Sequence, residues 1–293
     1  MEDYVYVDDF QKGTPDKTVD AVIKVNRTGN ILPDEYKYAR TAVERFFLRT
    51  VLPLFDTTQF SWTFGLRSEG SSSIVAVDAK WPDTQYLYDY RQVANVVTNA
   101  LQTLCASKGI EDIPTFHFNP TAGTFALIST EAFRAGYEVF VLDDFQRTMS
   151  TFQYSDDGKE GGLWRLDLTQ DIEEAPIQTL EHLSPVNFIL VRTNFPVQGT
   201  LLPNPVSVDS VSNQDESYLV NMKFIQNNNQ SIVDIPFSVG DGATHRWVNV
   251  IGGGNARKFE YSFFWKDYAD VVRPIVIPPW GRADILAQFR SIA

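Results

Sequence analysis

Histidine and cysteine, the side chains that most often serve as nucleophiles, general bases or zinc ligands, are scarce in this sequence. The 293 residues include three His and one Cys. His117, His182 and His245 lie far apart, and no Gly-x-Ser-x-Gly elbow accompanies them. Cys105 has no second Cys for a disulfide or zinc site, and it follows Leu104 in an apolar helical register that favours burial. The sequence therefore predicts no catalytic residue and no enzymatic activity.

Three acidic groups could in principle supply oxygen ligands to a hard cation such as Ca²⁺. They are Asp143-Asp144, Asp156-Asp157-Gly158 and the run Asp171–Glu174. None has the alternating ligands, central Gly and terminal Glu of an EF-hand loop. We expect the first group to cap a short helix, the second to form a turn and the third to be a solvated face. No metal site is predicted.

One glycine-rich segment, Gly252–Lys258, resembles a phosphate-binding loop at first sight. The Walker pattern needs Gly-Lys-Ser/Thr at the start of a helix, because the helix N–H groups and the Lys hold the phosphates. Here the chain continues into the strand-like segment Phe259–Trp265. A hairpin turn is the better interpretation, and we predict no nucleotide or other cofactor.

The charge balance excludes several function classes. With 25 Lys+Arg against 37 Asp+Glu, the formal net charge is −12. No cluster of Lys and Arg side chains is available to neutralise the phosphates of a nucleic-acid backbone. We therefore expect no direct nucleic-acid binding.

Apolar stretches such as Val186–Val191 are far shorter than the roughly 20 residues that cross a bilayer. The acidic start Met1-Glu-Asp-Tyr is unlike a secretory signal, so we expect synthesis in a reducing cytoplasm and no membrane span.

The composition is typical of many short strands joined by turns. Aromatic residues make up 13 % of the chain, together with 15 Pro and 17 Gly. The sequence predicts a mainly β protein, an antiparallel β-sandwich or jelly roll, with either one jelly roll or two in tandem. Alternating or continuous apolar patterns predict strands at the following segments: Gln59–Leu66, Ile74–Val77, Thr115–Phe118, Thr124–Ile128, Tyr137–Leu142, Val186–Thr193, Tyr218–Gln226, Ser231–Val239, His245–Ile251, Lys258–Trp265, Val271–Ile277 and Ile285–Arg290.

One amphipathic helix stands out near residues 89–107. Its apolar residues follow the i, i+3, i+4, i+7 spacing of a helix with one buried face. Asp89 is the expected N-cap and Gly109 the expected C-terminal stop. The segment Tyr36–Phe55 fits neither the helical nor the strand period, and we expect a strand near its end because Pro53 would interrupt a helix.

A change of composition between residues 155 and 185 suggests how the chain is divided. Gly and Pro, with an acidic run, are concentrated there. We predict an N-terminal β-rich half with the helix at 1–155, a connecting region at 156–185, and a C-terminal β-rich half at 186–293.

An ordered series of segments runs through most of the chain: Leu52–Phe55, Tyr88–Tyr90, Pro114–Pro120, Gly123–Leu127, Tyr137–Phe140, Phe188–Pro196, His245–Asn249, Phe264–Asp267, Arg273–Ile277 and Ile285–Arg290. In this order of features, the sequence resembles penton and minor capsid proteins of non-enveloped icosahedral viruses, as in virophages and in Polinton-like or adintovirus-like elements. The resemblance implies a jelly-roll virion protein that assembles through contacts with copies of itself and with other capsid proteins. The acidic N-terminus lacks the basic arm of genome-contacting shell proteins, which favours a vertex or outer-shell position.

Under this interpretation two Pro-rich, apolar segments are the predicted interfaces. Val271–Trp280 and Phe195–Pro205 each contain three Pro, which reduce the entropy lost on docking. The alternative is a receptor- or glycan-binding β-sandwich, a phage fibre tip or lectin-like module, whose platform would be the three rings of Phe259, Tyr261 and Phe263, with Phe264 and Trp265 beside them. Core packing of these three rings is the competing explanation, because alternate residues of a strand point to one face.

Overall fold

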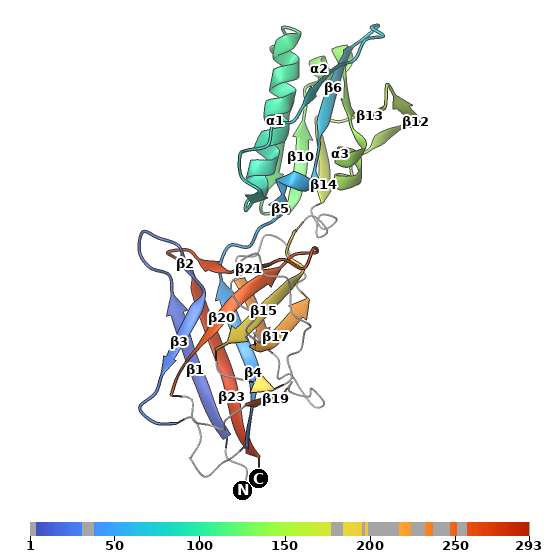
Figure 1. Cartoon of the computed structure of the whole chain (residues 1–293). Coiled ribbons are helices and arrows are strands. Elements are labelled where there is room, and N and C mark those ends of the chain that lie inside the picture. Colours follow the sequence, from blue (N-terminus) through green and yellow to red (C-terminus); the bar gives the residue numbers. More distant parts are fainter. Residues whose placement is uncertain are drawn as a thin grey trace. The chain divides into compact units, whose positions relative to one another are not determined.

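The computed structural model describes residues 4–30, 38–176, 184–194, 197–198, 217–223, 232–236, 247–250 and 257–292. Contacts between Cα atoms group these residues into two compact units (Figure 1). The first unit contains the described residues up to Leu52 and those from Val186 onward, and the second contains the described residues of Pro53–Pro185.

This division differs from the predicted halves 1–155 and 186–293 with a connector at 156–185. The predicted boundary at 186 coincides with the return to the first unit, but residues 156–176 belong to the second unit and the N-terminal strands belong with the C-terminal ones. The reason is long-range pairing: β1 (Tyr4–Lys12) and β4 (Tyr38–Arg49) both pair with β23 (Arg282–Ile292). The second unit is thus an insertion between β4 and β15 (Phe188–Thr193).

The first unit contains two antiparallel sheets. One has the order β1-β23-β4-β19-β16, with β18 also paired to β4. The other has the order β17-β15-β20-β21, with β3 also paired to β20, and β2 pairs separately with β22. The remaining strands are β2 (Val19–Asp20), β3 (Val22–Asn26), β16 (Val197–Gln198), β17 (Ser217–Lys223), β18 (Ile232–Pro236), β19 (Val248–Val250), β20 (Lys258–Lys266), β21 (Val272–Pro274) and β22 (Val276–Ile277).

The strand order of the first unit is that of a jelly roll. The eight main strands can be numbered 1 to 8 in chain order: β1, β3, β4, β15, β17, β19, β20 and β23. The two sheets then read 1-8-3-6 and 2-7-4-5, the interlocked Greek keys of the jelly-roll topology. The predicted jelly roll is confirmed. The second unit is built differently, so the described residues contain one jelly roll and not two.

The two sheets of the jelly roll enclose an aromatic core. Ring centroids of Phe46 on β4 and Phe263 on β20 lie 6.0 Å apart, and those of Phe259 on β20 and Phe289 on β23 lie 6.1 Å apart. These rings and that of Tyr261 are buried. Because strand residues alternate between faces, every second residue of β20 enters this core.

The second unit combines two sheets with three helices. A five-stranded sheet has the order β12-β13-β11-β6-β7, a three-stranded sheet has the order β14-β10-β9, and β5 pairs with β8. Its elements are β5 (Phe55–Asp56), the 3-10 turn Thr57–Gln59, β6 (Thr63–Ser68), β7 (Val75–Asp78), β8 (Tyr86–Leu87), α1 (Tyr90–Ser107), β9 (Thr115–Asn119), β10 (Thr124–Ile128), α2 (Glu131–Gly136), β11 (Tyr137–Val141), α3 (Asp143–Thr148), β12 (Tyr154–Glu160), β13 (Leu163–Leu166) and β14 (Ile172–Pro176).

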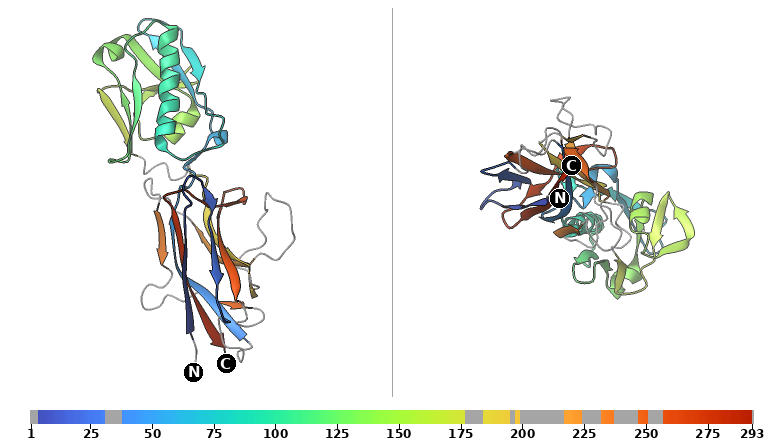
Figure 2. Two further views of the ribbon diagram at one scale, coloured as in Figure 1. Left: turned by 90° about the vertical axis from the view of Figure 1, so that its left-hand side faces the viewer. Right: turned by 90° about the horizontal axis from the view of Figure 1, so that it is seen from below.

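Helix α1 confirms the predicted amphipathic helix. The Asp89 side chain caps it by accepting a hydrogen bond of 2.8 Å from the backbone N–H of Arg91. The chain leaves the helix through Gly109, whose φ of 67° is the left-handed conformation that glycine adopts without strain. Figure 2 shows the helix beside the strands of this unit, onto which its apolar residues pack. Its buried residues include Val93, Val97, Ala100, Leu101 and Leu104.

Aromatic rings fill the core of the second unit. Phe116 on β9 stacks on Phe125 of β10 with 5.2 Å between centroids, and Trp62 meets the edge of Phe145 of α3 at 5.0 Å. Phe125 and Phe145 are almost completely buried. The unit therefore has a hydrophobic core of its own.

No helix among the described residues has both the length and the apolar character of a bilayer-spanning segment.

Candidate interaction surface

Of the residues weighed as catalytic, the structure describes His117 and Cys105 and does not bring these two together. His117 lies on an exposed face of β9, opposite Ala126. His182 and His245 lie outside the described residues. Cys105 is buried in α1, and burial raises the pKa of its thiol to about 11, so that the reactive thiolate is scarce at neutral pH. In the part of the chain that the structure describes, no three His, Cys, Asp or Glu residues are grouped to hold a metal ion.

Asp143 and Asp144 are the first two residues of a short helix, α3, so the predicted helix is present. The prediction that they cap it is wrong. The N-cap position is Leu142, and the two acids lie in the first turn without a side-chain capping bond. Asp143 instead accepts hydrogen bonds from Lys159 Nζ at 2.6 Å and from Trp164 Nε1 at 2.7 Å. The Lys159 bond, followed by the Trp164 bond, lowers the pKa of Asp143. These residues connect α3 to the neighbouring strands.

The other two acidic groups also have structural roles. Asp156 and Asp157 lie in β12, where the register with β13 shifts before Lys159, so the predicted turn is an irregular strand. In the third group, Asp171, Ile172 and Glu174 are exposed, as expected of a solvated face. Glu173 differs, because it is buried in β14 and accepts hydrogen bonds of 3.0 Å from the backbone N–H groups of Thr169 and Gln170.

Two further segments were considered as binding sites. Gly252–Ala256 lie outside the described residues, and Arg257 and Lys258 lead into β20, a strand as expected. The glycan platform is not present, because Phe259, Tyr261 and Phe263 are at most 3 % exposed. The competing explanation, core packing, is confirmed for these three rings.

The outward face of the first jelly-roll sheet carries an ordered set of charged and aromatic side chains. Strands β1, β23 and β4 are neighbours, and residues in register point to the same face. Three successive rows cross these strands at every second residue. From the end nearest the β22–β23 turn, the rows are Lys12, Arg282 and Arg49; then Phe10, Asp284 and Phe47; then Asp8, Leu286 and Arg45.

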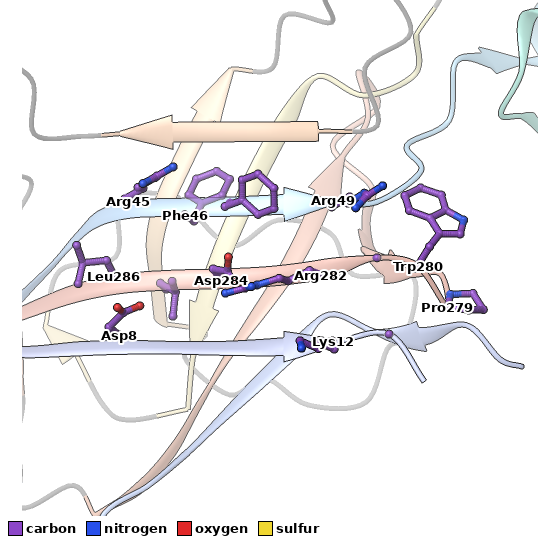
Figure 3. A pocket seen from close by; sticks show the side chains of 14 residues that line it. Asp8, Lys12, Arg45, Phe46, Arg49, Pro279, Trp280, Arg282, Asp284 and Leu286 are labelled. Carbon is purple, nitrogen blue, oxygen red and sulfur yellow. The ribbon is translucent and has the colours of Figure 1, made fainter. Parts of the chain in front are cut away.

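A pocket of about 680 Å³ opens on this face. We call it the basic pocket, because four cations and two carboxylates line it. Figure 3 shows the charged side chains along β1, β23 and β4, with Trp280 at the end beside Arg49. The residues that line it are Asp8, Lys12, Gly13, Arg45, Phe46, Phe47, Arg49, Pro279, Trp280, Gly281, Arg282, Asp284, Ile285 and Leu286.

Three like charges lie side by side in the first row, which we call the basic row: Lys12, Arg282 and Arg49. Arg282 has a carboxylate neighbour, since its Nε donates to Asp284 Oδ1. For Lys12 and Arg49, the described part of the chain offers aromatic rings only: Lys12 Nζ lies 5.7 Å from the centroid of Phe10, and the Arg49 guanidinium lies 5.6 Å from that of Trp280. Like charges directly opposite one another destabilise a sheet, so this row favours a bound anion.

The turn that presents Trp280 is held tightly by two glycines. The N–H of Gly13 donates to Gly281 O at 2.9 Å, and the N–H of Gly281 donates to Pro278 O at 2.8 Å. A Cβ on Gly13 would lie 2.0 Å from Pro278 O, and one on Gly281 would lie 2.6 Å from Arg49 O. Only residues without a side chain allow this close approach. The rim of the pocket is therefore fixed before any partner arrives.

Sequence reasoning found part of this surface. The predicted interface Val271–Trp280 includes Pro279 and Trp280 at the pocket rim. Phe195–Pro205 lies outside the described residues except for Val197 and Gln198. The four cations were missed because they come from three strands far apart in the chain. The one available signal was the segment Arg45-Phe-Phe-Leu-Arg49, in which two arginines four residues apart enclose three apolar residues.

No protein-family model matches this sequence, and no curated protein sequence does either. Solved structures do match. The crystal structure of the mavirus penton protein superposes with a TM-score of 0.78 at 26 % identity, covering 99 % of this chain and 100 % of that one. This chain has a virophage-type penton fold. A chain of the Sputnik virophage, determined by cryo-EM, matches in fold with a TM-score of 0.71 at 15 % identity, covering 99 % and 98 %.

The match to the mavirus penton protein extends over both units, since it leaves 1 % of this chain uncovered. The resemblance inferred from the sequence is thereby confirmed. The likeness to virophage capsid proteins supports a virion structural protein with a location in the virion and a non-enzymatic role.

Proposed function

We propose that this chain is a penton-type capsid building block, which functions by assembling with copies of itself and with other capsid proteins. The single observation that carries the proposal is the full-length match to the mavirus penton protein, with the jelly roll and its insertion both included. Synthesis in the host cytoplasm followed by incorporation into the virion belongs to the same proposal.

The physical basis of this function is surface complementarity. Stable association needs about 1,200 Å² or more of total buried surface. Closed symmetry lets each copy satisfy the same patch of its neighbour, which gives rings or shells of fixed size. The outward face of β1, β23 and β4 is one surface with the aromatic and arginine side chains that are enriched at such contacts.

The experiment is to purify the full chain and measure its mass by light scattering, with negative-stain imaging, across a range of salt and pH. We expect closed rings or shells of one symmetry under at least one condition, and co-assembly with the other capsid proteins of the same virus. A chain that stays monomeric in every condition, and fails to join those proteins, would contradict the proposal.

A further inference from the structure

We infer that the basic pocket receives an extended segment of a neighbouring capsid chain whose face toward the pocket carries both carboxylates and apolar side chains. The inference rests on the proposed function and adds the chemistry of the partner to it. It combines three observations: the charge of the pocket, its aromatic wall and its rigid rim.

The charge of the pocket is opposite to that of the chain. Its lining holds four cations and two carboxylates, a balance of +2, in a chain whose net charge is −12. The basic row places Lys12, Arg282 and Arg49 on adjacent strands, roughly 4.8 Å apart. Arginine and lysine in this arrangement bind carboxylates strongly, and a bound carboxylate removes the repulsion within the row.

The aromatic wall requires apolar side chains in the partner. Trp280, which lines the pocket, is 48 % exposed, and Phe10, which lies beside the pocket on the same face of the sheet, is 51 % exposed; both values are high for rings of this size. Both rings lie under cations, Phe10 under Arg282 at 4.6 Å and Trp280 under Arg49 at 5.6 Å. Exposed aromatic residues paired with arginine are the usual energetic centres of protein interfaces. A segment carrying acidic residues alone would leave these rings in water.

A protein segment fits this pocket better than a nucleic acid. Asp8 and Asp284 lie on the same face as the cations and would repel a continuous phosphate backbone. The net charge of −12 opposes the approach of any long polyanion. A peptide can place its carboxylates over the basic row and its apolar side chains over the acidic positions, whereas phosphates recur at every nucleotide.

The rigid rim lowers the cost of binding. Gly13 and Gly281 fix the turn that carries Trp280 through the two backbone hydrogen bonds at 2.8 and 2.9 Å. Because the wall is already in place, less conformational entropy is lost when a partner docks. The volume of about 680 Å³ is sufficient for a few side chains of an extended segment.

The test uses the full chain and a fluorescein-labelled synthetic peptide, Glu-Ser-Leu-Ser-Glu-Ser-Phe-Ser-Glu, with binding followed by fluorescence anisotropy. When the peptide is extended, its Glu, Leu and Phe side chains lie on one face. We expect saturable binding that weakens with added salt, and no binding of the same peptide with Lys in place of every Glu. The double variant Lys12→Glu/Arg49→Glu should weaken binding about tenfold or more. Trp280→Ala, which keeps every charge, should weaken it less but measurably.

The charge-reversal variant also separates binding from folding. It converts the basic row into Glu, Arg, Glu, so the repulsion between neighbours becomes attraction and the melting temperature should equal or exceed that of the wild type. The control is Lys258→Glu, one charge reversal of the same kind at an exposed position on the other sheet, which should leave peptide binding unchanged. A double variant that melts below the wild type would overturn the argument from repulsion.

Four further outcomes decide the inference. Peptide binding that is the same in wild type and double variant overturns it, as does tighter binding of a labelled DNA oligonucleotide at the same site. Protein that forms rings but binds no peptide overturns this inference alone. Protein that binds the peptide through the basic row but never assembles supports the pocket chemistry and contradicts the proposed function.

Discussion

Arg67 on β6 and Glu138 on β11 lie directly opposite one another in the second unit, and Arg67 Nε donates to Glu138 Oε2 at 2.5 Å. Glu138 also accepts a hydrogen bond of 2.8 Å from Arg165. The Arg67 bond, more than any other contact, holds the pKa of Glu138 below its usual value despite partial burial. One carboxylate therefore joins the strands β6, β11 and β13 across the outer face of their sheet.

The Glu138→Gln variant should lose stability in a pH-dependent way. The folded-state pKa of Glu138 is lowered, so its ionised form stabilises the fold above the ordinary value of 4.5, and this contribution disappears as the pH falls through the folded-state pKa. We expect the variant to lose about 1–3 kcal/mol of unfolding free energy at pH 7, and less at pH 3. Denaturant titration followed by circular dichroism measures both.

Glu69→Gln is the control for this prediction. Glu69 is exposed beside the same sheet, in the turn after β6. Its replacement should leave the unfolding free energy unchanged at both pH values. Equal losses for Glu138→Gln at pH 7 and pH 3 would show that charge does not carry the effect.

Gly281→Ala should destabilise the jelly roll. Its new Cβ would lie 2.6 Å from both Arg49 O and Ile277 Cγ2, so the backbone of β4 or the turn must shift. Forcing atoms into a packed site costs about 1–3 kcal/mol, which appears as a lower melting temperature. Gly29→Ala is the matched control, because nothing lies within 4 Å of its added Cβ. A Gly281→Ala protein as stable as Gly29→Ala would contradict the described turn.

Cys105 should report the opening of the second unit. The thiol is buried in α1 and its pKa is raised to about 11, so little thiolate is present or accessible at pH 8. We expect a thiol reagent such as DTNB to react with the native chain far more slowly than with the chain in guanidinium chloride. Because the chain has one Cys, the absorbance change comes from this site alone. Rapid native reaction at pH 8 would place the thiol at the surface.

The cap of α1 offers a smaller, local test. Asp89 accepts the backbone N–H of Arg91 at 2.8 Å, so Asp89→Ala leaves that donor without its side-chain partner. Removing such a cap costs about 1 kcal/mol. Thermal unfolding should show a corresponding drop in melting temperature, whereas Asp83→Ala, in the exposed segment before β8, should show none. An Asp89→Ala protein that melts with the wild type would argue against the cap.

Elements with local signals were predictable from the sequence. Helix α1 has a full apolar face between Asp89 and Gly109, and these two residues supply the start and stop signals that the structure uses. Strand β20 was found because its alternate aromatic residues all enter one core. In both cases the information lies within one continuous segment.

Strand β4 was harder to predict, and the structure gives the reason. Its register with β23 shifts so that Leu286 pairs with Arg45 while the next residue, Ala287, pairs with Val43. Glu44 is therefore an extra residue, a β-bulge that exchanges the faces on which side chains lie. Val43, before the bulge, and Phe46, after it, are both buried although they are an odd number of residues apart. No single period of two therefore fits the segment.

The sequence predicted neither the division into two units nor the basic row, and the reason is the same for both. Both depend on which strands pair, and strand pairing between distant segments leaves no periodic trace in the sequence. Lys12, Arg49 and Arg282 are ordinary exposed cations when taken one at a time. Only the β1-β23-β4 order makes them neighbours.

The position of β23 between β1 and β4 also determines when the molecule can become complete during synthesis. On the ribosome, β1 and β4 emerge long before their common neighbour, whereas the described residues of the second unit all lie in the one stretch Pro53–Pro185, which can fold once it leaves the exit tunnel. β1 and β4 cannot pair with β23 until the whole insertion and the strands after it have been translated. The basic row does not exist until Arg282 has been added, so an unfinished chain lacks this surface.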